Sequence, residues 1–173
     1  MKIIFSILFA GLVLGFNNNS FAQSDLKLKE GMKAPNFILQ NYNGKHFKLS
    51  SFKGKSFVVL YFYPKAGTPG CTKQACGIRD DHKAFKDKNI VVLGISVDSR
   101  KEIKKFVDEH TLNFPLLSDV KKLVSKKYGV LRDDGKAKRY TFIIDKNGVI
   151  AKIIEVKDVS SHAKEVYEIA SQL

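Results

Sequence analysis

The feature that most constrains the fold is a strand, turn and helix pattern around the only two cysteines of the chain. The apolar run Phe57–Phe62 is followed by Pro64 and Gly67, which is typical of a buried central strand that ends in a loop. From Cys71 onward the residues suit the first turns of a helix, whose apolar positions are Ala75, Ile78 and Phe85. We therefore expect Cys71 to open a helix that packs on the sheet.

The position of Cys71 favours a reactive thiol. In the first turn of a helix the backbone N–H groups are unpaired and the helix dipole is positive, and both stabilise the thiolate, which is the nucleophilic form of cysteine. Cys76 follows five residues later, which in an intact helix is about 7.5 Å along the axis and about 140° around it. The Cα atoms of a disulfide are rarely more than about 7 Å apart, so this pair can bridge only if the helix unwinds. That requirement disfavours a purely structural disulfide and suits a reaction cycle.

The loop and helix carry a recognisable spacing. Pro64, Thr68 and Cys71 form P-x-x-x-T-x-x-C, which resembles the active-site signature of the peroxiredoxins. The longer string YFYPKAGTPGCTKQACGIRD is similar to the Q-type subgroup, the bacterioferritin comigratory proteins, in which a second cysteine follows five residues after the first. The resemblance implies a thiol peroxidase that reduces hydrogen peroxide and organic hydroperoxides, and it implies no cofactor and no metal.

The resemblance also implies a role for each cysteine. Cys71 would be the peroxidatic nucleophile, and its attack on a peroxide would leave a sulfenic acid. Cys76 would resolve that acid as an intrachain disulfide, which an external thioredoxin-like dithiol donor would reduce. Gly77 would lower the cost of unwinding, because glycine weakens a helix.

Three further residues complete the expected site. The Thr68 hydroxyl would bond the thiolate and a peroxide oxygen, although by itself Thr68 is equally compatible with an ordinary loop cap. Pro64 would fix the loop and shield the thiolate from water. In the family an arginine near the start of a late strand faces the cysteine, and Arg139 stands at that place. By composition alone Arg79 and Arg132 are rivals, and Arg79 is better interpreted as a surface residue paired with Asp80 or Asp81.

The remaining pattern predicts one α/β domain. Strands alternate with helices and an antiparallel pair comes last, which favours a mixed sheet with helices on both faces, and the thioredoxin-like fold is the assignment. The expected elements are a hairpin around Asn43-Gly44, a strand Ile90–Val97, a helix behind a capping box at Ser99–Glu102, a helix Val120–Tyr128 capped by Asp119, strands Arg139–Ile144 and Val149–Val156, and a helix from Ser160 that buries Ala163, Val166, Tyr167, Ala170 and Leu173.

The first residues have the composition of a secretory signal. Lys2 precedes an apolar run that is shorter than the roughly 20 residues of a membrane span, and small residues lie at the positions that a signal peptidase reads. We expect residues 1–22 to be a signal peptide cleaved after Ala22, and residues 23–173 to form a single exported, periplasmic domain. An uncleaved membrane anchor is the alternative.

Other functions fit the chain less well. A thiol-disulfide oxidoreductase suits the fold and export, but such enzymes use C-x-x-C. A metal site from both cysteines and one of His46, His82, His110 or His162 lacks the expected spacing. The net charge of +13 suggests an anionic partner. Because the lysines are dispersed, we expect a solvated basic surface without nucleic-acid or membrane binding, and the family resemblance favours a monomer.

Overall fold

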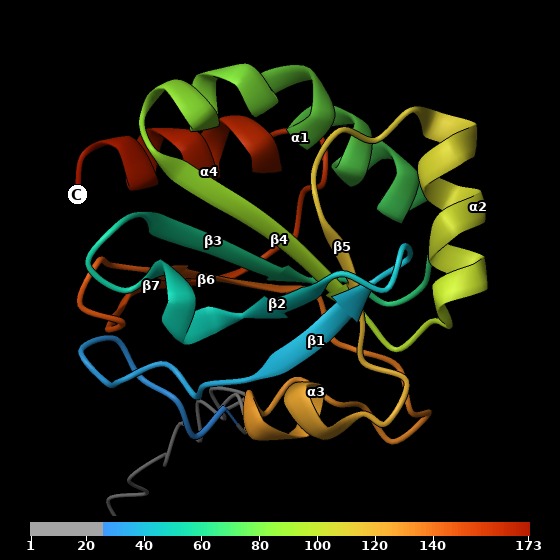
Figure 1. Cartoon of the computed structure of the whole chain (residues 1–173), viewed down its shortest axis with the longest axis horizontal. Coiled ribbons are helices and arrows are strands. Elements are labelled where there is room, and N and C mark those ends of the chain that lie inside the picture. The colour runs from blue at the N-terminus through green and yellow to red at the C-terminus, as the bar shows by residue number, and fades with distance from the viewer. Residues whose placement is uncertain (1–25) are drawn as a thin grey trace, which may run out of the picture.

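The computed structural model describes residues 26–173, which form a seven-stranded mixed sheet with helices on both faces (Figure 1). The strands are β1 Ile38–Asn41, β2 His46–Lys48, β3 Phe57–Phe62, β4 Ile90–Ser96, β5 Leu116–Ser118, β6 Tyr140–Ile144 and β7 Ile150–Glu155. The helices are the 3₁₀ helix η1 Leu49–Phe52, and α1 Pro69–Asp87, α2 Arg100–His110, α3 Leu123–Lys127 and α4 His162–Ser171. The expected signal peptide, residues 1–22, lies outside the described residues.

The sheet has the strand order β2-β1-β5-β4-β3-β6-β7. Strands β3, β4 and β5 run parallel, whereas β6 pairs antiparallel with β3 and β7 antiparallel with β6. The β1–β2 hairpin closes one edge through an antiparallel pairing of β1 with β5. The prediction of a thioredoxin-like α/β fold with an N-terminal β-hairpin is confirmed.

The central strand β3 supplies side chains to two cores. Successive residues of a strand point to opposite faces of the sheet, so Val59 and Tyr61 pack under α1, α2 and α4. Val58, Leu60 and Phe62 pack on the other face, with α3 and η1. Figure 1 shows α1 and α4 side by side over the first face and α3 beneath the second. Because both faces are covered, β3 reads as a continuous apolar run.

Two expected helix boundaries are wrong. Helix α3 begins at Leu123 and not at Val120, because Lys122 before it has a left-handed backbone with φ of 60°. Asp119 still acts as a cap, since its carboxylate accepts hydrogen bonds from the N–H groups of Val124 and Ser125. At the C-terminus, Leu173 lies beyond the end of α4 and its side chain is 55% exposed.

The loop between β3 and α1 is fixed from the neighbouring strand. The Ala66 N–H donates to the buried Asp98 carboxylate at 2.8 Å, and the Tyr63 N–H donates to the Ile95 carbonyl at 3.1 Å. Both acceptors lie at the carboxyl end of β4, so the loop is held over the end of the parallel strands. Within the same described residues, no helix is long and apolar enough to cross a membrane.

Candidate active site

Cys71 lies in the first turn of α1 and is only 2% exposed. The helix begins two residues before the expected start, with Thr68 as an extended N-cap and Pro69 as the first helical residue. Proline suits that position because its missing N–H needs no partner there. The first helical bond runs from the Thr72 N–H to the Thr68 carbonyl, at 2.8 Å. The Cys71 sulfur therefore lies where unpaired N–H groups and the helix dipole favour negative charge.

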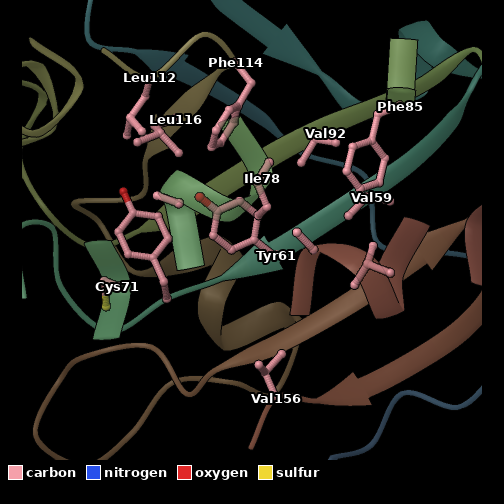
Figure 2. Packing of buried hydrophobic residues seen from close by; sticks show 14 of the residues in the cluster. Val59, Tyr61, Cys71, Ile78, Phe85, Val92, Leu112, Phe114, Leu116 and Val156 are labelled. Atoms are coloured by element: carbon pink, nitrogen blue, oxygen red, sulfur yellow. The ribbon is translucent and has the colours of Figure 1, made fainter. Parts of the chain in front are cut away.

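Cys71 also closes one end of the core between α1 and the sheet. Figure 2 shows it at the border of the buried cluster, with the Tyr61 ring in the middle and Phe85 and Val92 farther along. The apolar positions expected for the cysteine helix, Ala75, Ile78 and Phe85, are all buried in this cluster. The helix therefore presses its first turn against the sheet, and the thiol has apolar neighbours on the sheet side.

Arg139 contacts the sulfur from the residue just before β6, the strand that neighbours β3. Its Nη2 donates to Cys71 Sγ at 3.3 Å. The register explains this contact: Tyr140, the first residue of β6, pairs with Phe62, the last residue of β3. Arg139 precedes Tyr140, so the antiparallel pairing sets it beside the loop that leads from β3 to α1. A guanidinium at this place stabilises negative charge on sulfur or on a bound oxygen.

Gln74 is a site residue that the sequence analysis missed. It is 1% exposed, and its side-chain oxygen accepts a hydrogen bond from Nη1 of Arg139. One guanidinium therefore contacts both Cys71 and Gln74. Gln74 follows Cys71 by three residues, so the two lie on the same face of α1. That spacing is the signal that could have found it.

His162 extends this contact to a second helix. It is the first residue of α4 and has no exposed surface. Its Nδ1 lies 3.1 Å from Gln74 Nε2, and its Nε2 lies 2.8 Å from the Thr141 hydroxyl on β6. Burial, and then the nearby Arg139 cation, lower the pKa of His162 to about 4, so the ring is neutral at physiological pH.

The two remaining loop residues do not bond the thiol directly. The Thr68 hydroxyl donates to the Lys65 carbonyl at 3.1 Å, and this is its hydrogen bond in the described structure. The expected bond between Thr68 and the Cys71 sulfur is therefore absent from this structure, because the hydroxyl is turned back into its own loop. Pro64 is half-buried and lies at the start of that loop, two residues after the end of β3.

Cys76 is half-buried, and both cysteines are free thiols within one continuous α1. The intact helix therefore keeps the two side chains apart, as the five-residue spacing predicts. The two rival arginines are engaged elsewhere. Arg79 pairs with Asp80 at 2.8 Å and donates to the His110 carbonyl at 2.8 Å, and Arg132 pairs with Asp134 at 3.1 Å. Neither contacts Cys71.

The histidines do not join the cysteines in a metal site. Across the part of the chain that the structure describes, no three histidine, cysteine, aspartate or glutamate side chains come together in a way that could hold a metal ion. His82 packs on Phe114, with ring centroids 5.8 Å apart, and burial lowers its pKa. His162 belongs to the hydrogen-bonded chain behind Arg139.

Comparisons with known proteins agree on one family. Residues 31–153 match the model of the AhpC/TSA family. A peroxiredoxin Bcp of Buchnera aphidicola is 48% identical over 144 residues, which cover 79% of this chain and 90% of that protein. The crystal structure of the peroxidoxin BcpB of Mycobacterium tuberculosis matches with a TM-score of 0.79 and 34% identity, covering 84% and 98% of the two chains.

A further solved structure concerns the chemistry. It is the bacterioferritin comigratory protein of Xanthomonas campestris, whose structure was described for its alkyl peroxide reduction activity. It matches with a TM-score of 0.74 and 26% identity, and covers 79% of this chain and 90% of that chain.

The expectation of an exported, periplasmic protein is wrong. The Bcp relatives that match this chain are cytoplasmic peroxiredoxins. The expectation rested on one charge, a short apolar run and two small residues. Such a pattern constrains only composition, so it carries less information about location than extended identity to these relatives.

Proposed function

Because the chain belongs to the AhpC/TSA family and is a thiol peroxidase of the Bcp and peroxiredoxin Q kind, we propose a complete reaction cycle for its two cysteines. The observation that supports this cycle best is the contact of Arg139 with Cys71, 3.3 Å from a buried sulfur in the first turn of α1. A cation and a helix N-terminus on one sulfur favour a thiolate, which is the form that attacks a peroxide.

In the first step the Cys71 thiolate attacks the distal oxygen of a hydroperoxide. The S–O bond forms as the O–O bond breaks, and the leaving alkoxide or hydroxide takes a proton to become an alcohol or water. Cys71 is oxidised to a sulfenic acid. Arg139 stabilises the negative charge that moves from sulfur to the leaving oxygen.

Thr68 and Pro64 act on the substrate side of this step. The Thr68 hydroxyl donates its proton to the Lys65 carbonyl, so its oxygen keeps lone pairs that accept the O–H of a peroxide. Pro64 limits the access of water through the loop. This arrangement orients the peroxide without a direct bond from Thr68 to the thiolate.

In the second step Cys76 resolves the sulfenic acid. Its thiolate attacks the Cys71 sulfur, the S–S bond forms, and the hydroxide that leaves is protonated to water. Residues 71–76 of α1 must unwind first, since an intact helix separates the two thiols. A thioredoxin-type dithiol then returns two electrons and two protons.

The substrate range and the assembly belong to the same proposal. Reduction of organic hydroperoxides is supported by the alkyl peroxide reduction described for the similar Xanthomonas campestris protein. We infer that the chain works as a monomer, because both thiols lie on one helix and resolution needs no cysteine of a second chain.

A stopped-flow experiment on the full reduced chain tests the cycle. We expect one equivalent of hydrogen peroxide to disappear rapidly together with two thiols. Cys71→Ser should abolish this reaction. Cys76→Ser should consume one peroxide and leave a sulfenic acid at Cys71, which dimedone traps as an adduct. Undiminished peroxide loss in Cys71→Ser would contradict the nucleophile, and an unmodified thiol at Cys71 in Cys76→Ser would contradict the resolving role.

A further inference from the structure

The side chains of Arg139, Gln74, His162 and Thr141 form a chain of hydrogen bonds. The direction of each bond follows from the Arg139 guanidinium, which can only donate. A guanidinium has no acceptor, so the Gln74 oxygen must face Arg139 and the Gln74 NH₂ must face His162. The Nδ1 of His162 is then the acceptor and carries no proton. In the neutral ring the proton is on Nε2, which donates to the Thr141 hydroxyl oxygen. The chain from Arg139 to Thr141 thus has one arrangement.

We propose that His162 is a positioning residue for the peroxidase reaction: held by Thr141, it fixes the Gln74 amide and through it the guanidinium of Arg139 on Cys71. This inference deepens the proposed cycle and rests on the roles proposed there for Cys71 and Arg139. His162 touches neither the sulfur nor the expected peroxide site. It acts only through Gln74, whose rotation about its side-chain bonds would otherwise let Arg139 leave the sulfur.

The same contact joins the site to the unwinding of α1. Gln74 lies between the two cysteines, in the segment that must unwind before they can bridge. His162 lies on α4, which packs beside α1 and is not part of that segment. When Gln74 leaves, Arg139 loses its second partner and the Nδ1 of His162 loses its donor. The Gln74–His162 bond therefore stabilises the folded, peroxide-competent α1 against the unwound, resolving form.

Protonation of His162 is incompatible with this arrangement. A second N–H on Nδ1 would point at the NH₂ of Gln74, and no carboxylate of residues 26–173 is bonded to the ring. The groups that face it are Gln74 from α1, Tyr61 from β3, and Thr141 and Arg139 from β6 and the residue before it. Only Arg139 is charged, and it disfavours a second cation.

The direction of the pH effect follows from the two states of α1. In the folded form the pKa of His162 is about 4, below its ordinary value of 6.5. In the unwound form the ring loses the Gln74 contact and gains access to water, so its pKa rises toward 6.5. The contribution to the folded form is complete above about pH 6.5 and is lost as the pH falls toward 4. Acid within this window favours the unwound form.

The test compares His162→Leu, His162→Asn and Thr141→Val with the unchanged full chain. We expect His162→Leu to lower the second-order rate constant for peroxide about five- to tenfold, the effect of one buried hydrogen bond. His162→Asn places an amide oxygen near the former Nδ1, so it should restore most of that rate. Thr141→Val should lower the rate in the same direction as His162→Leu, because it removes the acceptor of the ring N–H.

A measurement on the unchanged chain keeps the inference testable if a variant fails to fold. Nitrogen-15 NMR of His162 should show the Nε2–H tautomer in the reduced protein, with no titration above pH 5. In the disulfide form its pKa should move toward 6.5. Equal pKa values in both redox states, or an undiminished rate in a folded His162→Leu, would overturn the inference. If the unchanged chain consumed peroxide no faster than Cys71→Ser, the proposed function itself would fail.

Discussion

At the scale of single residues, two buried tyrosines differ in one respect: Tyr61 lies in the core that contains Cys71, and Tyr128 lies in the core on the other face of the sheet. The hydroxyl of Tyr128 donates to the Pro35 carbonyl at 2.9 Å. The hydroxyl of Tyr61 is buried without a hydrogen-bond partner among residues 26–173. Burial is the main cause that raises the pKa of Tyr61 well above its ordinary value, so the phenol stays neutral. The same chemical group is thus satisfied in one core and unsatisfied in the other.

We predict that removing these two hydroxyls changes stability in opposite directions. Tyr61→Phe should raise the free energy of unfolding by about 1–3 kcal/mol, because an unsatisfied buried polar group is removed. Tyr128→Phe should lower it by about 0.5–1.5 kcal/mol, because a hydrogen bond is lost and the Pro35 carbonyl is orphaned. Urea unfolding of both variants with unchanged slopes measures this difference. A loss of stability in Tyr61→Phe would show that its hydroxyl has a partner in solution.

The residues of the site divide by how local their signals are. Cys71, Cys76, Thr68 and Pro64 stand within thirteen consecutive positions, so spacing alone brings them together. Gln74 follows Cys71 by three residues on the same helix, and this spacing places both side chains on one face, so it is a signal for Gln74. His162 is 88 residues from Gln74 in sequence, and only the packing of α4 on α1 brings them together. The sequence alone indicates His162 only as one of four possible metal ligands.

At the scale of elements, the proposed cycle requires α1 to be a stable helix and also to unwind. Gly77 follows Cys76 and lies against α4, where a Cβ would meet the Ala163 Cβ at 3.5 Å, an ordinary contact. An alanine therefore fits without strain. A side chain at position 77 is therefore not excluded by its neighbours. In the proposed cycle Gly77 instead lowers the helical stability of the segment that opens.

We predict that Gly77→Ala slows disulfide formation. Alanine should stabilise helical α1 by about 1 kcal/mol, so Cys76 should resolve the sulfenic acid about fivefold more slowly. Cys71 should then be over-oxidised to sulfinic acid at lower peroxide concentration. Mass spectrometry of Cys71 after peroxide titration, together with the rate of disulfide formation, measures both effects.

Asp81→Ala is the matched control on the same helix. Asp81 is exposed and lies beyond Cys76, outside the segment that opens. The change also raises helix propensity, by up to about 0.7 kcal/mol, but it should leave the resolution rate unchanged. Equal slowing in both variants would show that overall helix stability, and not the segment around Gly77, sets the rate.

The helices and strands are predictable where the sequence carries one clear local signal, such as a continuous apolar run or a capping box. The apolar runs of β3 and β4 predict these strands to within a residue, and the capping box predicts the start of α2. The start of α3 was not predictable, because a left-handed lysine at position 122 has no sequence signal comparable to glycine. Asp119 caps α3 as predicted, but it does so from farther away than a normal N-cap. Its carboxylate accepts a hydrogen bond from the Val124 N–H, five residues later in the sequence.

At the scale of the whole molecule, the net charge of +13 is not explained by the stability of the fold. Several surface lysines form helix pairs with an acid four residues away, such as Lys83 with Asp87 and Lys104 with Asp108. Such exposed pairs contribute little to stability. The excess charge instead creates a positive potential that raises the encounter rate with anionic partners and is screened by salt.

We predict that recycling by an acidic thioredoxin depends strongly on salt, whereas reduction by dithiothreitol depends on it only weakly. Raising sodium chloride from about 0.02 M to 0.3 M should lower the second-order rate with the acidic donor about tenfold, because screening shortens the reach of the positive surface. Dithiothreitol reacts as a small thiolate with a single negative charge, so its rate should fall much less than that of the acidic donor. Single-mixing kinetics of the disulfide form with each reductant measure the two dependences.

Two charge reversals locate the effect on the surface. Lys65 is exposed in the loop beside Cys71, and Lys55 is exposed just before β3, at the opposite end of that strand. Each reversal to glutamate changes the net charge equally. Lys65→Glu should slow reduction by the acidic donor more than Lys55→Glu, because steering acts where the donor must approach the disulfide. Equal slowing would mean that the total charge matters and its position does not, and a rate independent of salt would remove electrostatic steering from the recycling step.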